Sequence, residues 1–130
     1  MPWNIFNINT KDEHYGLCSR LDPWTPVARG KVLQLVCELT EGMTFVECDP
    51  KNRGRFVLEG GGRRLVVWQN RKAWTKTPGT SYTVEDVPAG ATKLLLYGWD
   101  GLRRTIELGT ERTVVVDGLT VGETYMFLVR

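Results

Sequence analysis

Beyond residue 30, the chain alternates short apolar runs with turn residues. The runs are rich in Val, Leu, Phe, Tyr and Trp, and Gly, Pro, Asn and Asp separate them about every 8 to 12 residues. This spacing is typical of an all-β sandwich or barrel, and no segment carries a convincing helical period. We therefore predict about nine strands, at residues 32–39, 43–48, 55–59, 63–69, 82–87, 92–99, 102–108, 113–117 and 123–130.

Three short connections predict hairpins between neighbouring strands. Residues 40–42 (TEG) are expected to join the first two strands, and residues 60–62 (GGG) the next two. The Asp100-Gly101 pair predicts a tight type I′ turn. Consecutive hairpins of this kind favour an antiparallel arrangement.

Residues 1–30 differ from the rest of the chain. They show neither a helical nor a strand period, and Pro23 and Pro26 favour extended backbone. We predict an extended N-terminal arm at residues 1–30, followed by a sandwich domain at residues 31–130. The arm is expected to pack on its own domain or on a neighbouring subunit through its aromatic side chains, Trp3, Phe6, Tyr15 and Trp24.

The C-terminal segment carries a corner motif made of Leu119, Gly122 and Tyr125, after which Tyr125, Phe127 and Val129 alternate. This pattern of residues resembles the tyrosine corner of fibronectin type III and related immunoglobulin-like β-sandwiches. The resemblance implies that the leucine and the tyrosine fill the core and that the hydroxyl bonds back to the backbone.

The resemblance also contains a departure. In that family another strand follows the corner strand, whereas this sequence stops at Arg130. Either the strand order differs, or the missing strand comes from elsewhere, with the N-terminal arm as a candidate. A sheet edge left open would invite a partner strand.

Charge and composition narrow the possible partners. The 17 basic and 15 acidic residues leave a net charge of +2, too balanced to imply nucleic acid or an anionic membrane. No apolar stretch approaches the roughly 20 residues that span a bilayer. The N-terminus lacks the pattern of a secretory signal, and the odd number of cysteines suits a reducing compartment. We expect synthesis in the cytoplasm.

The residues that catalysis needs are scarce. The one histidine, His14, and the cysteine Cys18 lie on the arm, and Ser19 and Ser81 lack a G-x-S-x-G elbow. Most carboxylates stand in turns or at strand ends, where they are solvated or bond the local backbone. We expect no enzyme and no cofactor.

A Cys₃His zinc site is the metal site to consider, from His14, Cys18, Cys37 and Cys48. Zinc sites usually contain closely spaced cysteine pairs, and this chain has none. In the first predicted hairpin, Cys37 would face Phe45 and Cys48 would face Gln34, which keeps the two thiols apart. We therefore expect no metal.

Two groups of side chains remain as candidates for binding. The aromatic group could stack on sugar rings, although sandwich cores often contain tryptophan; it comprises Trp68, Trp74, Tyr97 and Trp99. The basic group could follow a phosphate backbone, although a solvated surface explains it more simply; it comprises Arg53, Arg55, Arg63, Arg64, Arg71, Lys72, Lys76, Arg103 and Arg104.

These patterns lead to one main interpretation. The chain is expected to be an immunoglobulin-like antiparallel β-sandwich with an extended N-terminal arm, serving as a non-enzymatic assembly module. Small sandwiches with aromatic arms suggest a bacteriophage virion component, such as a head decoration, neck, tail or baseplate protein. Its partners would be copies of itself or other subunits. The alternatives are a carbohydrate-binding module and a small phage-encoded inhibitor of a host protein.

Overall fold

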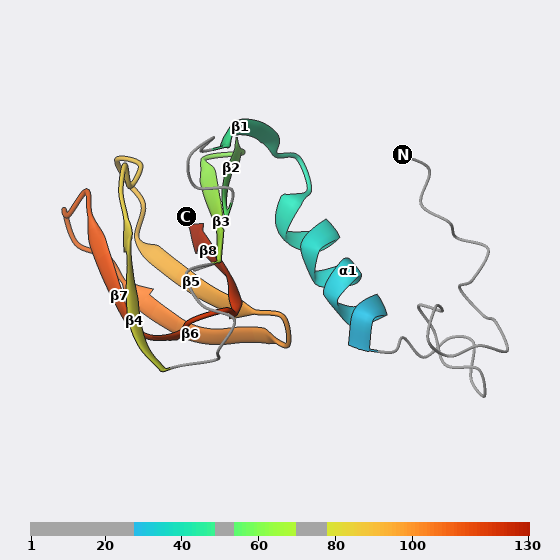
Figure 1. Cartoon of the computed structure of the whole chain (residues 1–130). Coiled ribbons are helices and arrows are strands. Elements are labelled where there is room, and N and C mark those ends of the chain that lie inside the picture. Colours follow the sequence, from blue (N-terminus) through green and yellow to red (C-terminus); the bar gives the residue numbers. More distant parts are fainter. Residues whose placement is uncertain (1–27, 49–53, 70–77) are drawn as a thin grey trace, which may run out of the picture. The chain divides into compact units, whose positions relative to one another are not determined.

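The computed structural model of the chain describes residues 28–48, 54–69 and 78–130 (Figure 1). The chain divides into two units, Met1–Glu38 and Leu39–Arg130, each considered by itself. The predicted division at residue 30 stays a prediction. The described elements are α1 (Ala28–Thr40), β1 (Thr44–Cys48), β2 (Arg55–Gly60), β3 (Arg63–Gln69), β4 (Pro78–Val84), β5 (Lys93–Gly98), β6 (Gly101–Glu107), β7 (Val114–Thr120) and β8 (Thr124–Val129).

The first predicted strand, at residues 32–39, is wrong, because this segment is helix α1. Its apolar residues Val32, Leu35, Val36 and Leu39 follow the i, i+3, i+4, i+7 spacing of one helix face. A short apolar run of this length fits a strand as well as a helix, so its β-rich composition was misleading. The predicted hairpin across residues 40–42 and its cysteine register are therefore absent.

The strands form two antiparallel sheets, which confirms the all-β sandwich. The larger sheet has the order β1-β2-β3-β8-β5-β6, and the smaller one pairs β4 with β7 (Figure 1). The two predicted hairpins within the larger sheet are present. The β2–β3 turn is Gly61-Gly62, whose positive φ angles of 60° and 73° suit a type I′ turn.

The β5–β6 turn lies one residue earlier than predicted. Gly98 pairs with Gly101, so that Trp99 and Asp100 form the two-residue connection. Asp100 has a negative φ, so the predicted type I′ turn at Asp100-Gly101 is wrong. Gly101, with a φ of 121°, takes the unusual backbone conformation as the first residue of β6 instead.

The core lies between the two sheets. It contains alternate residues of the large sheet, inward residues of the small sheet and one residue of the β4–β5 connection, Val87; the other members are Val57, Val66, Trp68, Val84, Leu94, Leu96, Val116, Leu119, Tyr125, Phe127 and Val129. Residues on the opposite side of the central strands are also buried, including Leu65 on β3 and Leu128 on β8. The centre of the large sheet is thus apolar on both faces.

The tyrosine corner is present as predicted. Leu119 and Tyr125 are buried, and the backbone N–H of Thr120 donates to the Tyr125 hydroxyl at 2.8 Å. Gly122 turns the chain with a φ of 86°.

The open edge expected beside the corner strand is absent. β8 lies inside the sheet and pairs with β3 on one side and β5 on the other. A different strand order, and not a strand supplied from elsewhere, therefore explains the departure from the family pattern. This interior position removes the argument that the arm or a partner completes the sheet next to Arg130.

Candidate binding surfaces

Several predicted residues lie outside the described part of the chain. These are the arm residues Trp3, Phe6, Tyr15 and Trp24, the loop residue Trp74, the basic residues Arg53, Arg71, Lys72 and Lys76, and His14 and Cys18 of the zinc set considered above. Their proposed roles stay predictions.

Trp68 belongs to the core, so it cannot stack on a ligand from solvent. Its indole is 7% exposed and lies 4.7 Å from the Tyr82 ring, measured between centroids. Tyr82 in turn stacks on Phe127 at 5.0 Å. These rings link β3 and β8 of the large sheet to β4 of the small one, and they account for Trp68 as a packing residue.

The other two described members of the predicted aromatic platform lie close together along the chain. Tyr97 is half-buried on β5, whereas Trp99 in the β5–β6 turn is 53% exposed. The structure therefore separates Trp68 from this pair. Of the predicted stacking residues that are described, Trp99 is the one that solvent reaches freely.

Arg103 ties the β5–β6 turn to the tyrosine corner. Its guanidinium donates to Asp100 at 3.0 Å and to Glu123 at 3.0 Å, and it lies 5.6 Å from the centre of the Tyr125 ring. The Tyr125 hydroxyl donates to the same Glu123 carboxylate at 3.0 Å. The hydrogen bond to Glu123 and the one to Asp100 raise the pKa of Arg103 against the effect of burial.

Other arginines of the predicted basic group also have partners within the chain. Arg55 bonds Glu47 at 2.6 Å, and Arg104 donates to the backbone of Asp117 at 2.6 Å. Such pairing favours the simpler interpretation of these residues as a structured, solvated surface over a path for a phosphate backbone.

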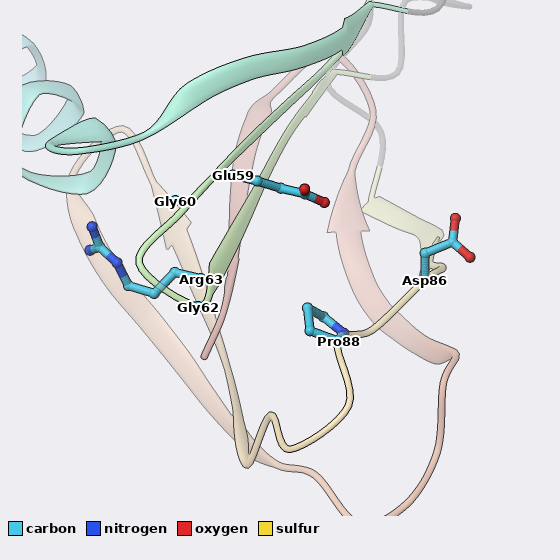
Figure 2. A pocket seen from close by; sticks show the side chains of 6 residues that line it. All are labelled: Glu59, Gly60, Gly62, Arg63, Asp86 and Pro88. Carbon is cyan, nitrogen blue, oxygen red and sulfur yellow. The ribbon is translucent and has the colours of Figure 1, made fainter.

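A shallow cavity of about 480 Å³ lies beside the β2–β3 turn. Figure 2 shows its lining, made by Glu59, Gly60, Gly62, Arg63, Asp86 and Pro88. The Arg63 side chain extends away from the two carboxylates, and it donates to the backbone oxygen of Glu41 at 2.8 Å. None of the described residues that line the cavity is aromatic, so these residues offer no surface on which a sugar ring could stack.

Arg64 explains the position of Glu59 in that cavity. The Arg64 side chain is buried, and its guanidinium forms an ion pair with the Glu59 carboxylate. A buried guanidinium needs a charged partner, so Glu59 already has a structural role. No group of three or more potential metal ligands occurs within residues 28–48, 54–69 and 78–130.

Among the described residues, three exposed large apolar side chains lie on the edge strand β1 and its neighbour β2. Every residue of β1 is exposed, with Phe45 at 60% and Val46 at 47%, and Phe56 on β2 is 40% exposed. We call Phe45, Val46 and Phe56 the β1 rim. A β-bulge interrupts the β1–β2 register between Phe45 and Glu47. Exposed aromatic and branched side chains on an edge strand are typical of interaction surfaces.

Sequence reasoning missed the β1 rim because of the helix. A strand at residues 32–39 would have paired with residues 43–48 and covered this edge. Because residues 32–39 are helical, they do not pair with β1, and its edge stays exposed. The helical spacing of the apolar residues at 32, 35, 36 and 39 was the signal that could have revealed the helix.

The opposite edge strand, β6, has a different surface. Leu102 is 54% exposed, but Arg103, Arg104 and Glu107 accompany it along the strand. Charged side chains discourage the addition of another strand. The two edges of one sheet therefore differ, with one charged residue among the five of β1 and three among the seven of β6.

Comparison with known proteins supports the fold. No family model and no curated protein matches this sequence. A solved structure, a GH30 endoxylanase from Clostridium papyrosolvens C71, superposes with a TM-score of 0.60 at 17% identity. The match covers 82% of this chain and 28% of the endoxylanase chain, so this chain spans less than a third of that protein's length. At this identity the likeness concerns the fold alone.

The described residues also contain no helix with the length and apolarity needed to cross a bilayer.

Proposed function

We propose that this chain is a non-enzymatic β-sandwich module that acts by binding another protein chain through the β1 rim. The observation that carries the proposal is the contrast between β1, an edge strand whose five residues are all exposed and include one charged residue, and β6, where three of seven residues are charged. Contiguous exposed apolar side chains on a folded domain are a mark of protein interfaces.

Site-specific photo-cross-linking tests this function, because it captures whichever chain lies against the β1 rim. Benzoylphenylalanine replaces Phe45 in the full chain, and the matched control carries it at Leu102, which is similarly exposed on β6. After irradiation in the cells that naturally make the protein, adducts from position 45 should exceed those from position 102 several-fold. Equal labelling, or none at either position, would refute the proposal.

Within this class of function, we infer a structural component of a bacteriophage virion, locked to its neighbours by the arm at residues 1–29. The support is an analogy of architecture: a small sandwich, an aromatic N-terminal segment, and few residues suited to catalysis. A truncated chain that begins at residue 30 should fold but fail to enter the assembly. Normal incorporation of the truncated chain would contradict the role of the arm.

Carbohydrate binding is a second candidate because Trp99 is exposed. An indole on a turn can stack on a sugar face, and the fold is shared with part of a protein described as an endoxylanase. Affinity electrophoresis in gels that contain xylan would test it. Retardation that disappears in Trp99→Ala, but persists in Leu102→Ala, would favour this candidate over a protein partner.

A further inference from the structure

We draw no further inference here: the strongest candidate, the shallow cavity beside the β2–β3 turn, carries nothing, because one of its two carboxylates, Glu59, already pairs with Arg64 and no other feature of the described residues points to a ligand there.

Discussion

The two edges of the large sheet differ in what lies against the glycine at their turns. At β1, the backbone of the preceding turn lies so close to Gly60 that a side chain there would collide with the Gly42 carbonyl oxygen. At β6, the Arg103 side chain holds the turn through Asp100 and Glu123. β1 is also joined to β2 by the Glu47–Arg55 ion pair, so the two edges differ in how closely the backbone packs at their turns and in how many charged side chains line the strand.

The largest loss of stability is expected from Gly60→Ala, on the β1 side of the sheet. The new Cβ would meet the Gly42 carbonyl oxygen and lie 2.9 Å from the Met43 Cα, so the backbone would have to move. We expect a loss of about 2–3 kcal/mol in the free energy of unfolding, as for overpacked sites. Urea denaturation measures it. A loss below about 0.5 kcal/mol, typical of neutral surface changes, would show that the backbone beside Gly60 can move aside at little cost.

A smaller loss is expected from Arg103→Ala at the β6 side. The change removes two partly exposed ion pairs and the cation that lies over Tyr125. Together these contacts should contribute about 1–2 kcal/mol. Arg104→Ala is the matched control, since it removes one exposed hydrogen bond to Asp117 and should cost about 0.5 kcal/mol. Equal losses in the two variants would contradict a special role for Arg103.

Gly98→Ala should cost about 1 kcal/mol, because its Cβ would collide with the movable Arg103 guanidinium and not with backbone. The cost should fall by at least half when Arg103 is already alanine. A double-mutant cycle in urea measures this coupling. Strictly additive losses would mean that the glycine matters for another reason.

The smallest expected effect is the loss of stability at low pH that results from protonation of Asp100. The hydrogen bond from Arg103 lowers the pKa of Asp100 below its ordinary value, so the folded state favours the charged carboxylate. The resulting stabilisation is complete above the unfolded-state pKa, about 3.9, and is lost as pH falls through the folded-state value. NMR signals of the β5–β6 turn should therefore shift below about pH 4, and Asp100→Asn should abolish that shift. An unchanged titration in the variant would assign the effect to another group.

Local patterns predicted much of the sandwich but not its edges. The β2–β3 turn and the tyrosine corner depend on residues that are close in sequence, namely Gly61, Gly62, Leu119 and Tyr125. The local sequence was therefore sufficient to predict both features. The helix at residues 28–40 was missed because, over a short run, its apolar residues fit the period of a strand as well as that of a helix.

The binding surface depended on contacts between distant segments. Whether Phe45 is exposed depends on which strands flank β1, and whether Trp68 is buried depends on Tyr82 and Phe127 lying beside it. Strand order decides both, and no motif near either residue encodes that order. The interior position of β8 illustrates this, since its own sequence had suggested an open edge.

The place of β8 between β3 and β5 has a consequence for the folding rate. The hairpins β2–β3 and β5–β6 need only local loop closure, whereas the pairing of Leu65 with Leu128 must bring together segments from distant parts of the chain. Closing such long loops is entropically costly, and domains rich in distant pairings fold in about milliseconds to seconds. We therefore expect the two hairpins to form early, and the insertion of β8 between them to limit the rate at which the sheet is completed.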